Sequence, residues 1–469
     1  MAYVITAVGA GGKTTYLRKR AEEYLRQGLR VVMTTTTHIW PPVDATSGLP
    51  VPETAQISGV SFFLENVQNP GNNLFPENVQ SAENTPFSEN DQNAGISFLQ
   101  GEDQTIPGTS SQAGSEEAAM RFPGAALNLP GKALVYAGKK EPSGKLSFPG
   151  EEAYQELCRI FDVVLAEGDG SHCMPVKIPG QTEPVIPEHT DEIVVVMGAH
   201  AVGRRLDVVC QRYARNPQLI YRMNLSDLDG RDDGADASEP KYVTEDLLSA
   251  LARQFYIEPL QCRYPDARIH FELSRMPHCA GRTAGVIMAS GFGRRYGGNK
   301  LLAPYCGKPL YRHTLEHVAA ALGKENTIVV TQYPEIRDEV RSMGIDAVMN
   351  PSADEGICAS IRIGTQRAID MKADRVMFFA ADMPDLPAEE IAMFARQFAG
   401  SGKWYGCMEF GEEHTATNPG AFRLDKAAEK LLQLTGDRGA MRIMKQEPWN
   451  IYSYQIAPEW ARDIDTKEL

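Results

Sequence analysis

The chain has 469 residues and a formal charge of −14 at pH 7, and its length predicts two or three domains rather than one hydrophobic core. The negative charge argues against general binding of DNA or RNA, whose phosphate backbones are held by basic patches. No apolar run approaches the roughly 18 residues of a membrane span. The 8 cysteines form no CxxC pair, which argues against a disulfide framework and a four-ligand zinc site. We therefore expect a cytoplasmic protein that acts on small molecules, with no nucleic-acid or membrane partner.

The chain begins with an apolar strand over residues 3–8, a glycine-rich turn over 9–12 and an amphipathic helix over 13–27. Backbone N–H groups of such a turn, together with the N-terminus of the following helix, can bind phosphate. The full P-loop template has its first glycine where this chain has Ala7. The predicted nucleotide-binding residues of the turn are Gly9, Gly11, Gly12, Lys13 and Thr14.

Apolar strands alternate with helical segments through the rest of this half. The strands are predicted at 31–35, 133–137, 162–167 and 192–198. Near-continuous apolar strands are typical of parallel sheets that are covered on both faces. One of these strands ends in Glu167-Gly-Asp169, which places two carboxylates where a nucleotide site holds its metal ligand. We predict that Glu167 and Asp169 are metal ligands.

Residues 51–118 have a different composition, rich in Asn, Gln, Ser, Glu and Pro. A repeat of twelve residues begins at Phe63, Phe75 and Phe87. Such a composition buries too little apolar surface to offset the entropy of ordering. We interpret the segment as a disordered insert, and the alternative is a binding array in which each Phe is an anchor.

This half resembles the YqeC-type accessory proteins that are linked with selenium-dependent molybdenum hydroxylases. The matching pieces are GAGGKTT at 9–15, TTTTHI at 34–39, EGDG at 167–170 with Pro175-Val-Lys177, and EPVIP at 183–187. The resemblance implies NTP binding and a role in cofactor maturation, with transient contact to a molybdenum hydroxylase apoprotein.

The second half repeats the pattern of strand, glycine-rich turn and following helix. The strand is predicted at 284–289, the turn at 290–299 and a helical segment from Lys300 onward. Residues 301–310 are predicted to lead into a helix with Pro309 near its first position. Glycines let backbone N–H groups approach a triphosphate closely, and cationic side chains neutralise the charge that builds up at the α-phosphate. We predict nucleotide contacts from Ala289, Ser290, Gly291 and Gly297, and catalytic cations at Arg295 and Lys300.

An aspartate follows a later apolar strand, predicted at 376–379. Ligands of open α/β sheets bind at the carboxyl ends of the strands, and one carboxylate there suits Mg²⁺, which keeps several of its waters. We therefore predict Asp382 as a catalytic metal ligand. The alternative is a helix N-cap aspartate before Pro384.

These motifs resemble the MobA-like nucleotidyltransferases, whose signature runs LAGGxSxRMGxxK with an Asp after a later strand. The chain keeps Arg295, Gly297 and Lys300 of the signature and departs from it at Ser290, Gly293 and Tyr296. Within that group it most resembles the molybdenum cofactor cytidylyltransferases. The supporting pieces are NKLL at 299–302, NPSADEGICAS at 350–360, GDRGA at 436–440 and DIDT at 463–466.

The resemblance implies transfer of CMP from CTP to molybdenum-bound molybdopterin, with release of pyrophosphate. Arg295 and Lys300 would hold the CTP phosphates, Asp382 would bind Mg²⁺, and Asp465 is a second metal candidate. The acceptor side would be lined by Ser360, Gly436, Asp437 and Gly439. A terminal phosphate of molybdopterin would be the nucleophile, so catalysis would consist of positioning and charge neutralisation.

Two alternatives stay open. One is a related transferase that uses GTP or a sugar- or polyol-phosphate acceptor, and the other is a non-catalytic chaperone of the molybdenum cofactor. For the fold, we predict two tandem three-layer α/β domains with mostly parallel sheets: a P-loop-like domain over 1–270 and a Rossmann-like nucleotidyltransferase domain over 283–469. The segment 262–282 is the predicted connection, and it offers no motif through which one site would complete the other.

Overall fold

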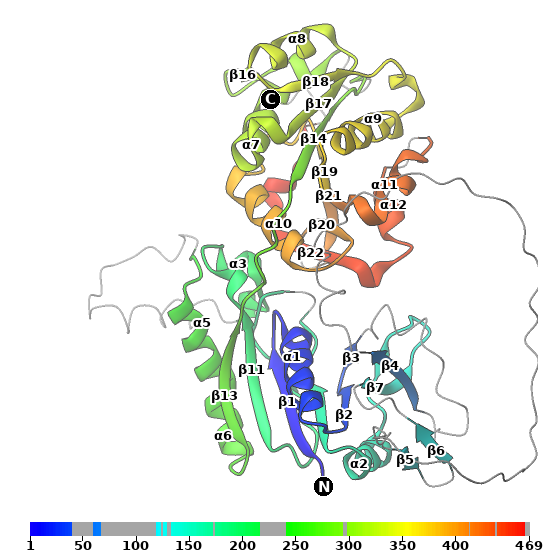
Figure 1. The fold of residues 1–469 in the computed structure, drawn as a ribbon. Helices are drawn as coiled ribbons and strands as arrows, with labels where there is room; N and C mark the ends of the chain where they lie inside the picture. Colours follow the sequence, from blue (N-terminus) through cyan, green and yellow to red (C-terminus); the bar gives the residue numbers. More distant parts are fainter. Residues whose placement is uncertain are drawn as a thin grey trace, which may run out of the picture.

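The computed structural model describes residues 1–39, 60–66, 119–122, 125–128, 133–171, 174–215, 241–293, 298–411, 413–436 and 439–464. Two α/β bodies follow one another along the chain, each built on its own sheet (Figure 1). In the part of the chain that the structure describes, no helix is long and apolar enough to cross a membrane.

The N-terminal sheet has the strand order β13-β11-β1-β9-β2-β7-β8-β3, and β4 pairs with β7. The strands from β13 to β7 in this order run parallel, whereas β4 and β8 run antiparallel to β7. The strands of this sheet are β1 (Tyr3–Gly9), β2 (Val31–Thr35), β3 (His38–Ile39), β4 (Ser61–Asn66), β7 (Ala133–Lys140), β8 (Leu146–Ser147), β9 (Val163–Glu167), β11 (Glu192–Gly198) and β13 (Arg268–Ser274). Two short pairs lie outside it: β5 (Ala119–Phe122) with β6 (Ala125–Asn128), and β10 (Val176–Lys177) with β12 (Cys210–Gln211).

Helices cover both faces of this sheet because successive strand residues point to opposite sides. On β1, Ile5 and Ala7 pack with the buried face of α1, whereas Val8 packs in the cluster that includes α5. Val4 packs in a further cluster that includes α2. The helices of this domain are α1 (Lys13–Arg26), α2 (Glu151–Ile160), α3 (Leu206–Val209), α5 (Glu245–Ala252) and α6 (Glu258–Arg263), the last two joined by the π-helical η5 (Arg253–Ile257).

The strand β4 lies within the segment predicted to be disordered, so that prediction is wrong for residues 61–66. The strand pairs with β7 along its whole length. Its Glu65 is buried, forms an ion pair with Arg18 and accepts a hydrogen bond of 2.9 Å from the hydroxyl of Tyr136. The repeats that begin at Phe75 and Phe87 lie outside the described residues.

The strand β13 lies within the predicted connection between the domains. It pairs with β11 over seven residues at the edge of the N-terminal sheet. The chain between the two sheets is therefore shorter than predicted, because it runs from the end of β13 at Ser274 to the start of β14 at Thr283.

The C-terminal sheet has the order β18-β17-β14-β19-β21-β20-β22, in which β21 runs antiparallel to both neighbours and the other pairs are parallel. Helices α7, α8 and α10 pack in a cluster with Ile287, and α9, α11 and α12 pack in a cluster with Val286, its neighbour on β14. Both domains are thus three-layer α/β folds, as predicted. The strands are β14 (Thr283–Ala289), β17 (Thr327–Thr331), β18 (Asp346–Met349), β19 (Arg375–Ala380), β20 (Tyr405–Phe410), β21 (Thr415–Arg423) and β22 (Ile451–Ile456). The helices are α7 (Leu310–Leu322), α8 (Pro334–Ser342), α9 (Ile357–Asp370), α10 (Ala388–Gly400), α11 (Leu424–Leu432) and α12 (Met441–Met444).

The helix predicted from Lys300 onward is only a single 3₁₀ turn, η6 (Lys300–Leu302). A short antiparallel pair, β15 (Pro304–Tyr305) and β16 (Lys308–Pro309), follows it. The helix α7 begins at Leu310 with Pro309 as its N-cap, which confirms the predicted start near Pro309. The two prolines explain the difference, because proline has no N–H group for a helical hydrogen bond.

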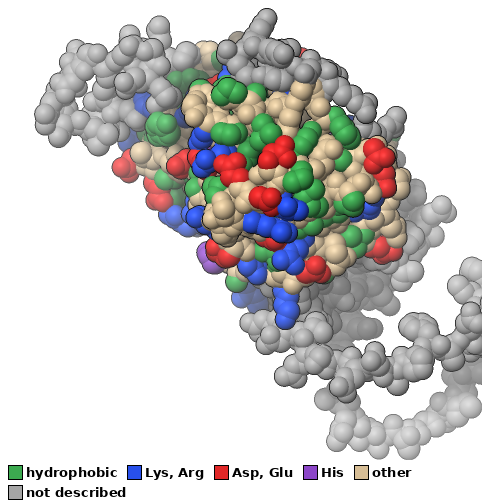
Figure 2. Space-filling view, turned by 90° about the horizontal axis from the view of Figure 1, so that it is seen from above, with side chains coloured by type: hydrophobic (Ala, Val, Ile, Leu, Met, Phe, Trp, Pro, Cys, Tyr) green, Lys and Arg blue, Asp and Glu red, His purple; other side chains and the backbone are tan. Residues whose placement is uncertain are grey.

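Acidic and basic side chains lie beside one another on the face seen in Figure 2, with hydrophobic side chains among them. On the side of the C-terminal domain that is turned toward the N-terminal domain, α3 lies beside β22 and α10 (Figure 1).

Candidate functional site

The N-terminal glycine-rich turn joins the end of β1 to the start of α1. Gly9, Gly11 and Gly12 have φ values of 94°, 68° and 115°, in the left-handed region that favours glycine. A Cβ atom on Gly9 would overlap the carbonyl oxygen of Val196, and one on Gly11 would lie 2.8 Å from the amide nitrogen of Gly198. The neighbouring strand β11 therefore packs too closely for side chains at these positions.

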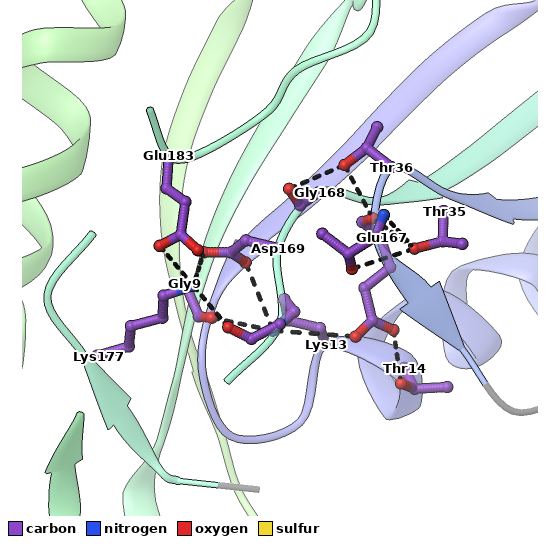
Figure 3. A network of polar contacts seen from close by, with 12 residues as sticks. Gly9, Lys13, Thr14, Thr35, Thr36, Glu167, Gly168, Asp169, Lys177 and Glu183 are labelled. Carbon is purple, nitrogen blue, oxygen red and sulfur yellow. Dashed lines mark hydrogen bonds and ion pairs between the residues drawn. The ribbon is translucent and has the colours of Figure 1, made fainter. Parts of the chain in front are cut away.

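The predicted lysine and carboxylates of this site lie together (Figure 3). Lys13 is buried, donates a hydrogen bond of 2.9 Å to the carbonyl of Gly9, and lies 3.5 Å from Asp169 and 3.9 Å from Glu167. The hydroxyl of Thr14 donates to Glu167 over 2.7 Å, although the two residues are 153 positions apart. The contact arises because β1 and β9 are parallel neighbours whose carboxyl ends meet at one edge.

A second layer of charges surrounds Asp169, and the sequence prediction did not assign it. The side chain of Lys177 is fully buried, lies 3.1 Å from Asp169 and 2.9 Å from Glu183, and donates to the carbonyl of Gly170. Arg212 contacts the same Oε2 atom of Glu183 over 2.6 Å and donates to its Oε1 atom over 3.1 Å. The sequence signal for Lys177 was its position in the Pro175-Val-Lys177 segment, which follows the EGDG segment at 167–170.

Burial and charge act in opposite directions on these carboxylates. Burial raises the pKa of the Glu167 carboxyl, and this rise is opposed by the Lys13 ammonium and the Thr14 hydroxyl. Burial also raises the pKa of Glu183, but hydrogen bonds from Arg212 and Lys177 outweigh it and bring the pKa down to about 2. Glu183 is therefore held as a carboxylate.

The donor set at this edge fits a hard divalent cation such as Mg²⁺, which prefers oxygen ligands. It consists of the Thr14 hydroxyl and the carboxylates of Glu167 and Asp169. Asp169 is fully buried, and its two carboxylate oxygens face the ammonium groups of Lys13 at 3.5 Å and Lys177 at 3.1 Å. Within the described ranges, no three His, Cys, Asp or Glu side chains gather as a metal centre. A cation would therefore need phosphate or water oxygens to complete its shell, as Mg²⁺ does in nucleotide sites.

The C-terminal turn is attached to the end of β17. The hydroxyl of Ser290 donates to the carbonyl of Val330 over 3.1 Å, and the carbonyl of Gly291 accepts from the hydroxyl of Tyr333 over 2.7 Å. The carbonyl of Ala289 accepts from Thr331 over 2.9 Å. Ser290 thus directs its side chain into the sheet, and its backbone carbonyl accepts a hydrogen bond of 2.7 Å from the side-chain amide of Gln332. Arg295 and Gly297 lie outside the described residues.

The predicted site residues Lys300 and Asp382 lie together in the C-terminal domain. The ammonium of Lys300 lies 2.5 Å from the carboxylate of Asp382 and donates to the carbonyl of Ile464 over 3.2 Å. The amide of Ile464 donates to the carbonyl of Asp382 over 3.1 Å. The N-cap alternative for Asp382 is wrong, because the next helix is capped at Pro387 without a side-chain hydrogen bond.

The predicted acceptor side lies at the start of α9 and in the loop after α11. Ser360 is buried, and its hydroxyl accepts a hydrogen bond of 3.1 Å from the side chain of Asn350. Arg362 on the same helix donates to the carbonyl of Leu434, two residues before Gly436. A Cβ atom on Gly439 would lie 3.9 Å from Ile357, so this loop lies against α9. Asp437 and the metal candidate Asp465 lie outside the described residues.

Two family models match this chain, one in each half. Residues 5–95 and 102–214 match the family model described as YqeC protein. Residues 285–450 match the model described as MobA-like NTP transferase domain.

Among curated relatives, the Escherichia coli (strain K12) protein named "Uncharacterized protein YqeC" is 28% identical over 43% of this chain and 54% of its own length. A Thermococcus kodakarensis protein named "Probable molybdenum cofactor guanylyltransferase" is 32% identical over 24% of this chain and 53% of its own length. The chain thus spans about half the length of these relatives.

Solved structures of other proteins are similar to part of this chain. Rv0371c from Mycobacterium tuberculosis H37Rv is 21% identical and aligns with 40% of this chain and 94% of its own, with a TM-score of 0.35. Molybdopterin-guanine dinucleotide biosynthesis protein A from Archaeoglobus fulgidus is 17% identical and aligns with 39% of this chain and 93% of its own, with a TM-score of 0.31. On the two family matches, the chain joins an N-terminal YqeC domain to a C-terminal MobA-like NTP transferase domain.

Proposed function

We propose that the C-terminal domain joins CMP from CTP to the terminal phosphate of molybdenum-bound molybdopterin and releases pyrophosphate. The observation that carries this proposal is the Lys300–Asp382 pair, which lies where the carboxyl ends of β14 and β19 meet. A cation and a metal-binding carboxylate at that edge are what phosphoryl chemistry at an open α/β sheet requires.

The proposed reaction needs no protein nucleophile. An oxygen of the acceptor phosphate attacks the α-phosphorus of the nucleotide, a P–O bond forms, and the bond to pyrophosphate breaks. Lys300 would neutralise charge on the phosphates, and Asp382 would hold a Mg²⁺ ion that supplies further charge neutralisation when bound. Arg295 would act beside Lys300, and Asp465 is the proposed second metal ligand.

Nucleotide choice is the open part of the proposal. CTP is supported by the motifs at 299–302, 350–360 and 436–440, which resemble those of cytidylyltransferases. GTP is the second candidate, because the Thermococcus relatives carry the name molybdenum cofactor guanylyltransferase.

The deciding experiment measures pyrophosphate release by the whole chain with molybdenum-bound molybdopterin and each of four NTPs. CTP should exceed GTP by about tenfold or more, because base-specific hydrogen bonds can supply at least that discrimination. Equal or faster release with GTP would make the enzyme a guanylyltransferase. No release with any NTP, while the cofactor still binds, would favour the chaperone alternative.

For the N-terminal domain, we propose that the turn at 9–14 binds an NTP with a divalent cation at Glu167 and Asp169, in support of molybdenum hydroxylase maturation. The close contacts of Lys13, Thr14 and the two carboxylates support this proposal. Lys13→Ala should weaken NTP binding to this domain at least about tenfold, because it removes a cation from an anion-binding helix N-terminus. Lys19→Ala, an exposed position on the same helix, is the matched control. Equal NTP affinity in the two variants would refute the site.

A further inference from the structure

Two consecutive arginines of the N-terminal domain contact the C-terminal domain. Arg204 and Arg205 precede α3, and their partners lie on α10, on β22 and in the 3₁₀ helix η10 (Pro458–Ala461) that follows β22. Neither arginine belongs to the motifs of either nucleotide site.

Arg204 is the buried contact of this pair. It is 2% exposed, and its guanidinium carbon lies 3.8 Å from the centre of the Tyr454 ring. It lies 3.3 Å from the carboxylate of Glu390 and donates to the carbonyl of Gln455. The hydroxyl of Tyr454 donates to the same Glu390 over 2.5 Å. Arg204 therefore attaches the N-terminal domain to β22 and α10 at once.

Arg205 holds the segment that follows β22. Its guanidinium lies 2.5 Å from the carboxylate of Glu459 and 5.5 Å from the centre of the Trp460 ring, both in η10. A second contact to Asp207, at 2.7 Å, orients the same guanidinium from its own domain.

The held segment ends at the C-terminal site. Ile464 lies three residues beyond η10, donates its amide to the carbonyl of Asp382 and accepts from the ammonium of Lys300. Residues 454–464 are thus fixed by the arginines at one end, and at the other they contact both members of the Lys300–Asp382 pair.

We propose that Arg204 and Arg205 are positioning residues for nucleotidyl transfer, and that they act by fixing residues 454–464 so that Ile464 orients Lys300 and Asp382. The inference rests on the proposed function of the C-terminal domain. Misplacement of a reacting or charge-neutralising group by about 1 Å can lower a rate by about 10²-fold. In this proposal, two residues of the N-terminal domain thus act on the site of the C-terminal domain through residues 454–464.

The activity test uses the whole chain with Arg205→Ala, Arg205→Lys and the control Arg253→Ala, which removes an exposed arginine paired with Glu258. We expect Arg205→Ala to lower kcat about tenfold with the KM for the nucleotide nearly unchanged, because Lys300 and Asp382 are present but misplaced. Arg205→Lys should recover most of the activity, since it keeps a cation opposite Glu459. An unchanged kcat, or a lysine variant as impaired as the alanine variant, would overturn the proposal.

A second measurement does not depend on catalysis. Amide hydrogen exchange over residues 457–464 should be faster in Arg205→Ala than in wild type and unchanged in Arg253→Ala. If the wild-type chain transfers no nucleotide from any NTP, the proposed function fails, and this exchange measurement alone decides the inference. Equal exchange in wild type and Arg205→Ala would overturn it.

Discussion

At the scale of single residues, the two domains share one arrangement. A lysine that follows a glycine-rich turn contacts a carboxylate placed after the neighbouring parallel strand: Lys13 with Asp169, and Lys300 with Asp382. Each pair offers a cation for phosphate and an anion for a divalent metal at the same edge of a sheet. Similar local patterns thus produce two candidate phosphate sites in one chain.

Removing either member of the C-terminal pair should impair transfer. Lys300→Ala and Asp382→Asn should each lower kcat by about 10²-fold or more, as loss of charge stabilisation does in other active sites. The unfolding temperature should change little, since both side chains are partly exposed. Lys324→Ala, an exposed lysine elsewhere in the domain, is the control. Near-normal turnover by Asp382→Asn would show that the metal is bound elsewhere.

Glu183 predicts a pH dependence of stability. Its pKa is about 2 in the folded chain, below the roughly 4.3 of an unperturbed Glu. A lowered pKa means that the carboxylate stabilises the fold fully above the unfolded pKa and loses this contribution as pH falls toward 2. In urea unfolding between pH 7 and pH 3, the advantage of wild type over Glu183→Gln should therefore shrink at acid pH. Glu188→Gln, at an exposed position, should show no such change. If the free energies of unfolding of wild type and Glu183→Gln changed with pH in parallel, the lowered pKa of Glu183 would be contradicted.

At the scale of elements, β4 shows how tertiary contacts can order a segment of unfavourable composition. The strand adds to β7, and its Glu65 is paired with Arg18 from α1 and with the Tyr136 hydroxyl. The buried carboxylate of Glu65 is stable in this strand because Arg18 and the Tyr136 hydroxyl, which lie on neighbouring elements, both contact it.

Truncating Glu65 should test this account. Glu65→Ala leaves the buried Tyr136 hydroxyl without its acceptor, so the free energy of unfolding should fall by about 1–3 kcal/mol. Glu65→Gln keeps an acceptor and should cost less. In a Tyr136→Phe background the cost of Glu65→Ala should be smaller, and a double-mutant cycle in urea measures the difference. If the effects of Glu65→Ala and Tyr136→Phe on the free energy of unfolding were fully additive, the contact between Glu65 and the Tyr136 hydroxyl would contribute nothing to stability.

At the scale of the whole molecule, the domains are joined by more than a linker. The interface contains the buried Arg204, the hydrogen bond from Gln397 to the carbonyl of His200, and the exposed ion pair between Arg205 and Glu459. The two sheets follow one another along the chain, but these contacts make the position of residues 454–464 depend on both.

Arg204→Ala should destabilise the C-terminal domain in the whole chain. Loss of one partner of a buried ion pair typically costs about 3–5 kcal/mol, because the remaining charge stays buried. Adding Glu390→Gln should recover part of this loss in denaturant unfolding, since it removes that charge. The exposed Arg253→Ala should change stability by no more than about 0.5 kcal/mol. An Arg204→Ala variant as stable as Arg253→Ala would refute the importance of this contact.

Much of the architecture could be predicted from local patterns. Apolar runs predict buried parallel strands, and the strands β1, β2, β9, β11 and β14 lie where those runs are. Glycine-rich turns after β1 and β14 predict phosphate loops, because glycines let backbone N–H groups approach a phosphate closely. Glu167, Asp169 and Asp382 were predicted as metal ligands because each lies at or just after the end of an apolar strand, and parallel strands present their ends at one edge.

Only the tertiary structure decided the features that depend on partners distant in sequence. Lys177, Glu183 and Arg212 become one charge network only when the fold brings their separate segments together. The prolines at 304 and 309 replace a predicted helix with a strand pair, and pairing with β7 turns residues 61–66 into a strand. The contacts of Arg204 and Arg205 span more than 180 positions, so no local pattern could indicate them. Local periodicity and turn chemistry therefore determined the layers and the turns of this protein, whereas burial and long-range pairing of charges decided which side chains surround each site.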